Sequence, residues 1–158
     1  FNYGIHIAEA LAGIMGPGVQ WVKYLGRGEA GSKYSESYYL QHEGGASAIF
    51  NTFTGVWQPF VITVMTTKNT FHFKLDSSRL YSALVEQICN YMEGKPHLLA
   101  NCDALLESVY VMLAATASRK EQGRPVSLHS LSESGPSYDG TAFWQEYGAA
   151  SGAMYKNL

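Results

Sequence analysis

The order of periodic segments predicts an α+β fold: a mostly antiparallel (mixed) open β-sheet covered by helices on one face. A pattern of helical spacing opens the chain, several strand-like segments follow between Ser37 and Leu75, and longer helical patterns come after residue 80. Strands that are grouped together, with helices at both ends, are typical of α+β proteins. No interdomain linker interrupts the pattern, so we expect one domain over residues 1–158.

The composition is that of a soluble globular protein. Of the 158 residues, 46% are hydrophobic and 15% are charged, and the formal net charge is −2. No cluster of Lys and Arg could follow a phosphate backbone, and no apolar run approaches the roughly 20 residues that a bilayer crossing requires. We therefore expect no nucleic-acid partner and no membrane insertion.

The cysteines and the chain start say little about the compartment. Cys89 and Cys102 lie in helical patterns, and two cysteines cannot build the disulfide framework of a small secreted domain, so we expect buried thiols. Residues 1–6 show neither an initiator methionine nor a charged leader, and we expect the natural N-terminus to lie upstream. The compartment stays unassigned, with the cytoplasm favoured.

The first segments predict a helix, a strand and a loop. Apolar residues recur at helical spacing over Tyr3–Met15, and Gly16-Pro17-Gly18 ends that helix. Imperfect alternation predicts a strand over Val19–Leu25. The glycine-rich stretch Gly26–Ser32 is interpreted as a loop.

Two hairpins follow. Ser37–Glu43 and Ala46–Thr54 flank Gly44-Gly45, a pair that can adopt the positive φ of a tight turn. Phe60–Met65 and Thr70–Leu75 form a second pair of strands around a short polar turn. Successive antiparallel strands predict a single sheet.

Helical patterns dominate the rest of the chain. One runs from Leu80 to Tyr91 and ends at Gly94-Lys95-Pro96, and a second runs from Leu105 to Thr116 and ends at Gly123. A short strand is predicted over Pro125–Leu128, a polar loop over Ser130–Ser137 and a closing helix over Tyr138–Ala150.

Four local signatures, in this order, resemble one known family. They are Tyr3–Leu11 with its exit Gly16–Val19, the Gly44-Gly45 hairpin, the turn Thr66–Thr70, and the helix pair whose stops are Gly94-Lys95-Pro96 and Gly123–Leu128. Together they are similar to the C-terminal domain of the Gfo/Idh/MocA oxidoreductases, the family of glucose-fructose oxidoreductase, inositol dehydrogenase and MocA. The resemblance implies a GAPDH-like C-terminal domain and a sugar, polyol or related hydroxyl compound as substrate.

The resemblance also implies an N-terminal domain that binds NAD or NADP, and the sequence of this chain does not contain its motifs. A dinucleotide site needs Gly-x-Gly-x-x-Gly between a strand and a helix, so that backbone amides reach the pyrophosphate. Gly26–Gly31 matches only the crude spacing and no βαβ unit follows it. The family's Glu-Lys-Pro segment is absent too, since Gly94-Lys95-Pro96 ends a helix. We expect the chain to be inactive without the cofactor domain.

His6 is the candidate catalytic residue, because the resemblance places it where the family directs a histidine toward the substrate hydroxyl. An imidazole can take or share the proton that an alcohol loses as hydride leaves. Many relatives have an Asp four residues earlier, where this chain has Asn2, which can hydrogen-bond but cannot act as a base. Asn2, Tyr3 and Glu9 are candidate substrate-binding residues, and Glu9 could also orient the imidazole.

Ordinary structural roles compete with these assignments. His6 could be a partly buried helix histidine bonded to the backbone, and Glu9 a solvated or ion-paired helix residue. His42 and His72 are interpreted as sheet-surface residues, and the histidine spacing predicts no metal site.

The strands carry more aromatic residues than one core face holds. Alternation sends some of them to the face that the helices leave open. These residues are Tyr38, Tyr39, Phe50, Phe53, Trp57 and Phe60. In the resembled family that face often packs against another subunit, which implies a homo-oligomer formed through the sheet.

Two functions stay open from the sequence. The first is the substrate-binding and assembly domain of an NAD(P)-dependent oxidoreductase. The second is a non-catalytic assembly or carbohydrate-binding module with the same fold. Asn2 in place of the relatives' Asp would suit this second function.

Overall fold

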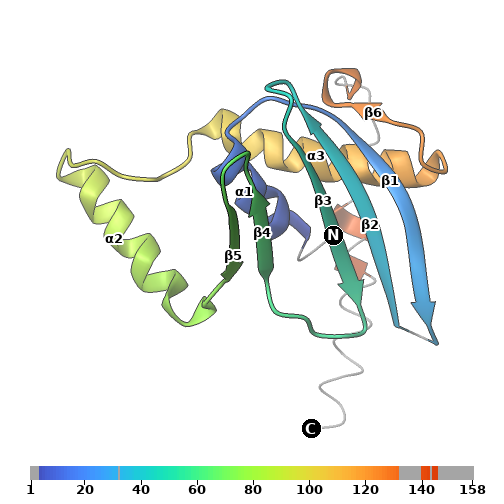
Figure 1. Ribbon diagram of the computed structural model, residues 1–158. Helices are drawn as coiled ribbons and strands as arrows, with labels where there is room; N and C mark the ends of the chain where they lie inside the picture. Colours follow the sequence, from blue (N-terminus) through green and yellow to red (C-terminus); the bar gives the residue numbers. More distant parts are fainter. Residues whose placement is uncertain (1–3, 32, 132–139, 143, 146–158) are drawn as a thin grey trace, which may run out of the picture.

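The computed structural model describes residues 4–31, 33–131, 140–142 and 144–145, and it is built on an antiparallel sheet with helices on one face (Figure 1). The strand order is β3-β2-β1-β6. The strands are β1 (Val19–Ala30), β2 (Lys33–His42), β3 (Ser47–Thr54) and β6 (Val126–Ser127), and the covering helices are α1 (Gly4–Met15) and α3 (Cys102–Lys120). The predicted α+β class is confirmed.

The core lies between the sheet and the two helices. Along β2, Tyr38 and Leu40 are buried toward the helices, whereas Tyr39 points to the open face, as strand alternation requires. Phe50 of β3 stacks on Tyr38 with ring centroids 5.1 Å apart. The predicted aromatic residues of β2 and β3 are therefore divided between the core and the open face, where Phe53 is exposed.

The predicted first hairpin is confirmed. β2 and β3 pair in register from Tyr34 opposite Thr54 to Gln41 opposite Ser47. Gly45 has a φ of +82° in the turn between them, a backbone angle that glycine adopts without steric cost.

β1 is longer than predicted, and the expected loop over Gly26–Ser32 is wrong for most of its length. Residues 26–30 pair with β2 after a register shift between Tyr24 and Gly26. Gly26 has a φ of +151°, so a glycine takes up the irregularity and the ladder then continues. The Arg27 guanidinium lies 3.6 Å from the ring centre of Tyr34 on the neighbouring strand.

The second hairpin forms as predicted, but the expectation of one sheet is wrong. β4 (Val61–Met65) and β5 (Thr70–Lys74) pair only with each other, as a separate two-stranded sheet. Two residues direct the chain out of the main sheet: Gly55, with a φ of +75°, turns it at the end of β3, and Pro59 cannot donate to a ladder.

The predicted central helices are confirmed, and α2 stands apart from the sheet. After the short 3-10 helix η1 (Ser77–Arg79), α2 spans Leu80–Met92, and Gly94 just beyond its end has a φ of +68°. Figure 1 shows α2 at one side of the molecule, joined to α3 by an extended linker. The expectation of buried thiols is wrong, because Cys89 and Cys102 are both exposed.

The last predicted elements are only partly described. β6 falls within the predicted strand over residues 125–128 and is followed by the 3-10 helix η2 (Leu128–Ser130). Of the predicted helix over 138–150, residues 140–142 and 144–145 are helical, and the others lie outside the described residues, as do 132–137 of the predicted loop. Within the described part of the chain, no helix has both the length and the hydropathy for a membrane span.

Candidate functional site

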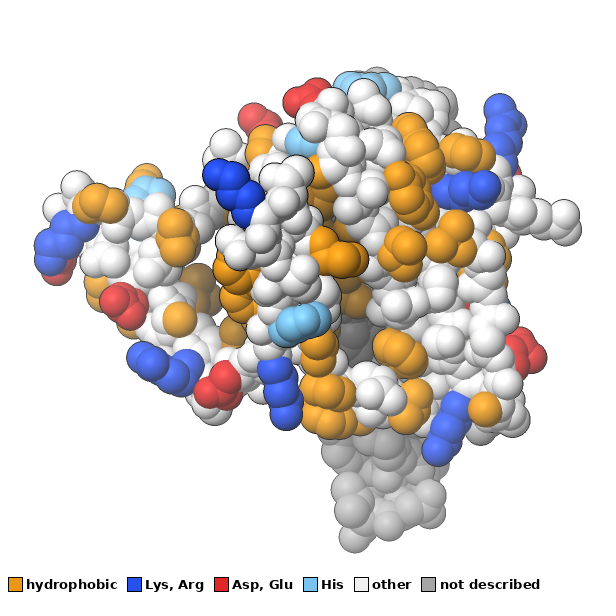
Figure 2. Space-filling model, in the orientation of Figure 1, with side chains coloured by type: hydrophobic (Ala, Val, Ile, Leu, Met, Phe, Trp, Pro, Cys, Tyr) orange, Lys and Arg blue, Asp and Glu red, His pale blue; other side chains and the backbone are white. Residues whose placement is uncertain are grey.

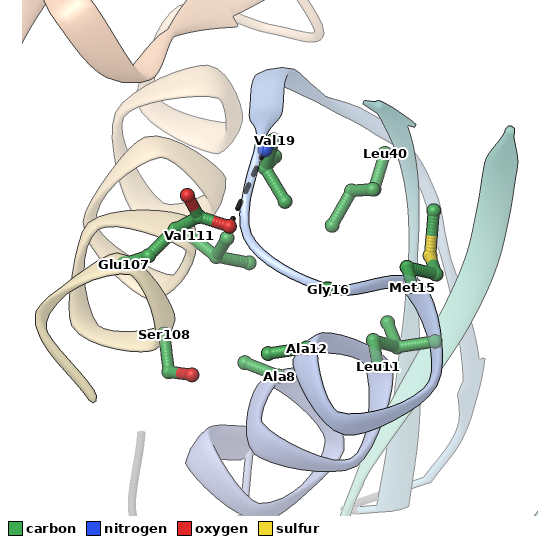
Figure 3. Close-up of a pocket in the computed structure, with 10 residues that line it drawn as sticks. All are labelled: Ala8, Leu11, Ala12, Met15, Gly16, Val19, Leu40, Glu107, Ser108 and Val111. Carbon is green, nitrogen blue, oxygen red and sulfur yellow. Dashed lines mark hydrogen bonds between the residues drawn. The ribbon is translucent and has the colours of Figure 1, made fainter. Parts of the chain in front are cut away.

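The turn after α1, which sets where this helix points, is held by a carboxylate of α3. The Glu107 side chain accepts hydrogen bonds from Gly18 N at 2.9 and 3.0 Å and from Val19 N at 3.3 Å. Figure 3 shows Glu107 reaching across from α3 to Val19. Bonds from backbone amides to a charged acceptor are the stronger kind, so this contact ties α1, β1 and α3 together.

His42 holds the same turn from the other side, which corrects its assignment as a sheet-surface residue. It is buried, Gly44 N donates to its Nδ1 at 3.0 Å, and its Nε2 lies 3.0 Å from Pro17 O. Because Nδ1 accepts a hydrogen, Nε2 carries the ring hydrogen and donates it to Pro17 O. His42 is therefore a structural residue, buried because the end of β2 lies against the α1–β1 turn.

The contact between α1 and α3 contains a small void but no room for a substrate (Figure 3). Its volume is about 10 Å³, which is the space of about one water molecule. It is lined by Ala8, Leu11, Ala12, Met15, Gly16, Val19, Leu40, Glu107, Ser108 and Val111. This side of α1 serves packing.

His6 lies on the opposite side of α1. Helical geometry places it across the helix axis from Ala8 and Ala12, which face α3. Its side chain is 56% exposed, with Nδ1 3.5 Å from Oε2 of Glu9. The ring meets Phe60 edge to face, with centroids 6.2 Å apart. Glu9 and Phe60 thus both contact the imidazole, and more than half of the His6 side chain is exposed.

The pair of His6 and Glu9 suits proton transfer to or from a hydroxyl group. A distance of 3.5 Å is long for a hydrogen bond, so Glu9 acts on the ring mainly through its charge. That charge favours the tautomer with hydrogen on Nδ1, whose Nε2 is the acceptor. Of the predicted site residues, the structure brings these two together, while Asn2 and Tyr3 lie outside the described residues.

A larger cleft, which the sequence reasoning did not identify, lies on the other side of α3. It has a volume of about 760 Å³, within the range of small-molecule sites. Trp21 of β1, Tyr110 of α3 and His129 of η2 contribute to its walls. Their positions are far apart in the sequence, so no local motif signals the cleft, and His6 is not among the residues that line it.

The glycine-rich segment does not fit a dinucleotide. Its residues from Gly26 to Ala30 are paired with β2, so their backbone groups belong to a sheet ladder rather than to a helix N-terminus that could cradle a pyrophosphate. Among the residues whose structure is described, no group of three or more His, Cys, Asp or Glu side chains is arranged to hold a metal ion.

The fold is similar to that of a solved protein structure. The chain superposes with a TM-score of 0.61 and 20% sequence identity on a protein of Desulfitobacterium hafniense described as a "putative NADPH-dependent oxidoreductase". The match covers 82% of this chain and 47% of the other, so the chain spans about half of that protein's length. No protein-family model and no curated protein sequence matches the chain.

Proposed function

We propose that this chain is the substrate-binding and assembly domain, C-terminal in its protein, of an NAD(P)-dependent oxidoreductase of the Gfo/Idh/MocA type. Its substrate would be a sugar, a polyol or a related hydroxyl compound. The observation that carries the proposal is the accessible His6 ring beside the Glu9 carboxylate, on a helix whose opposite face is fully used in packing. The fold likeness to one half of an oxidoreductase supports it.

In this proposal, His6 acts on the proton of the substrate hydroxyl. Nε2 accepts that proton while Glu9 stabilises the positive charge that forms on the ring. Phe60 limits how far the ring can turn, because its edge-to-face contact orients the imidazole plane. Asn2 and Tyr3 would bind the substrate by hydrogen bonds.

The nicotinamide cofactor, NAD or NADP, would be bound by an N-terminal domain outside this chain. The described residues offer no phosphate-binding loop, since Gly26–Ala30 is a paired strand. The chain would therefore bind and orient the substrate and move its proton, and would be inactive alone.

The open face of the sheet would pair with a second subunit. Trp21 and Tyr39 stack there with ring centroids 5.2 Å apart, and Ile49 is 65% exposed nearby on β3. An apolar patch of this kind on a sheet is typical of an interface.

A non-catalytic assembly or carbohydrate-binding module is the second candidate. The observation that favours it is Asn2, which stands where the resembled enzymes commonly have an Asp. An amide can hold a sugar hydroxyl without accepting its proton.

The test is made on the complete protein, including the region encoded upstream of Phe1. We expect His6→Ala to lower turnover of a reactive polyol by about 100-fold to 10,000-fold, the usual contribution of a general base, while NAD(P) binding is retained. The matched control is His72→Ala, which removes another exposed histidine, on β5, and should leave turnover unchanged. Unchanged turnover in the His6 variant would remove His6 from catalysis, and failure to bind either nucleotide would remove the enzyme assignment.

A further inference from the structure

The cleft beyond α3 has acidic and apolar walls. Among the described residues that line it are three with carboxylates, Glu43, Asp103 and Glu107, and none of the others is Lys or Arg. Leu106 and Tyr110 line the cleft as well. With Asp103 and Glu107 they repeat every three or four residues, which places all four on one face of α3. This face of α3 is one wall of the cleft, and the start of β1, the β2–β3 turn, β6 and η2 contribute the rest.

Two of the carboxylates meet at Gly18. Glu107 accepts hydrogen bonds from Gly18 N, and Figure 3 shows its side chain between α3 and the start of β1. Glu43 lies against the same glycine, with Oε1 2.7 Å from where a Cβ atom on residue 18 would stand. The backbone fixes this approach, because Glu43 N donates to Gly18 O at 2.9 Å. Only a residue without a side chain leaves room for both carboxylates.

The negative charge of the cleft is not balanced by basic side chains of the described residues. Their ion pairs include neither Glu43 nor Glu107. Figure 2 shows acidic and histidine side chains along the upper edge of the molecule, which carries the β2–β3 turn in Figure 1, with the visible Lys and Arg side chains nearer the sides and the lower part. Like charges that lie close together repel, and a bound cation relieves that repulsion.

The cation that suits this cleft is organic rather than metallic. Within the described part of the chain, these carboxylates do not form a group that could hold a metal ion. The cleft has a volume of about 760 Å³, far more than an ion needs and typical of small-molecule sites. Leu106 and Tyr110 are 52% and 41% exposed on its wall, so an apolar group can cover them. A tyrosine ring also attracts an ammonium group.

We propose that this cleft binds an organic ammonium ion with an apolar body, such as an aralkylamine. The ammonium group donates hydrogen bonds to Glu43 and to Glu107, and the apolar body covers Leu106 and Tyr110. Asp103 contributes less, because it lies in the first turn of α3, where the positive end of the helix dipole offsets part of its charge. His6 does not line the cleft, so this site is separate from the one proposed for a polyol.

Three probes of similar size and different charge test the proposal by calorimetry on the complete protein without nucleotide. They are phenethylamine, phenethyl alcohol and hydrocinnamate. We expect the amine to bind about tenfold or more tightly than the alcohol, since it adds hydrogen bonds to charged groups, and the anion to bind most weakly. Equal affinities for the amine and the alcohol, preference for the anion, or no binding of the amine would overturn the proposal.

NMR of the ¹⁵N-labelled histidine rings locates the bound amine. His129 lines the cleft and His6 does not, so we expect the His129 resonances to shift on titration with phenethylamine and those of His6 to stay in place. A shift at His6 alone would contradict a site beyond α3. Neither measurement uses turnover or a cofactor, so the result does not depend on the function proposed for His6.

Two pairs of variants separate the carboxylate from the apolar wall. Glu43→Gln should weaken amine binding about tenfold, whereas Glu121→Gln removes an exposed carboxylate outside the cleft and should change nothing. Leu106→Lys should abolish binding, because its own ammonium group would occupy the acidic wall. Leu105→Lys is the matched control, since Leu105 is 47% exposed and does not line the cleft. Equal affinities within either pair would contradict the proposed site.

Discussion

Replacing Glu107 by Ala should destabilise the domain, because this side chain holds the turn between α1 and β1. The carboxylate accepts from two backbone amides, Gly18 N and Val19 N, at distances between 2.9 and 3.3 Å. A hydrogen bond to a charged group contributes about 1.5–3 kcal/mol. The site is only partly buried and water can replace part of the interaction, so we expect a loss of about 2 kcal/mol. Since 1 kcal/mol shifts the Tm of a domain of this size by about 2–4 °C, the Tm should fall by about 4–8 °C.

Chemical and thermal unfolding followed by circular dichroism measure this loss. Glu121→Ala is the matched control. Glu121 directly follows the last residue of α3, and its carboxylate lies on the exposed surface, 3.6 Å from Nη1 of Arg124. Its effect should stay within about 0.5 kcal/mol. Glu107→Gln keeps an acceptor oxygen, so its loss of stability should lie between those of Glu107→Ala and Glu121→Ala. If Glu107→Ala and Glu121→Ala unfold at the same temperature, the reasoning about the turn is wrong.

Two further predictions concern the buried Glu36. Arg119 Nη1 lies 3.0 Å from its carboxylate, so Arg119→Ala removes the positive charge beside buried Glu36, which keeps the hydrogen bond from Tyr38 OH. Because the arginine is partly exposed, we expect a loss of about 2 kcal/mol in urea unfolding rather than the larger cost of a fully buried pair, and Arg124→Ala should change little. Burial, together with the charge of Glu36, raises the pKa of Tyr38 well above its ordinary value. The folded state therefore holds the Tyr38 proton more tightly than the unfolded state, and stability should fall as the pH rises above about 10. Tyr38→Phe should reduce this fall, and an unchanged pH dependence would contradict the assignment.

The elements with local signals could be predicted from the sequence. The Gly44-Gly45 turn and the helical pattern of α2 are encoded by neighbouring residues, so a short window of sequence reveals them. The ends of α2 and α3 could be predicted as well, because glycine commonly follows the last turn of a helix. Gly94 and Gly123 do adopt the positive φ angles of such positions.

The features that depend on distant partners could not be predicted. Gly26–Ala30 reads as a loop, yet it forms a strand because β2 pairs with it. The β4–β5 hairpin leaves the main sheet after Gly55 and Pro59, and alternation within its strands does not show which sheet they join. Cys89 and Cys102 were expected to be buried because they lie in helical patterns and are too few for a disulfide framework, but both are exposed.

The candidate site was only partly accessible to sequence reasoning. The position of His6 on α1 follows from helical spacing and its contact with Glu9 from the three-residue separation. Its contact with Phe60 joins residues far apart in the chain and had no sequence signal. The same is true of the cleft near His129, which residues of β1, α3, β6 and η2 line.

NMR resonances of the histidine rings in the complete protein test most directly whether substrate binds at His6. Of the two candidate binding regions, the one on α1 contains His6 and the cleft beyond α3 contains His129. The protein is labelled with ¹⁵N-histidine and titrated with a polyol substrate in the presence of NADP+. We predict that the ring resonances of His6 shift with substrate concentration and those of His129 do not. Shifts at His129 with an unperturbed His6 would place the substrate in the cleft beyond α3 and contradict the proposed site.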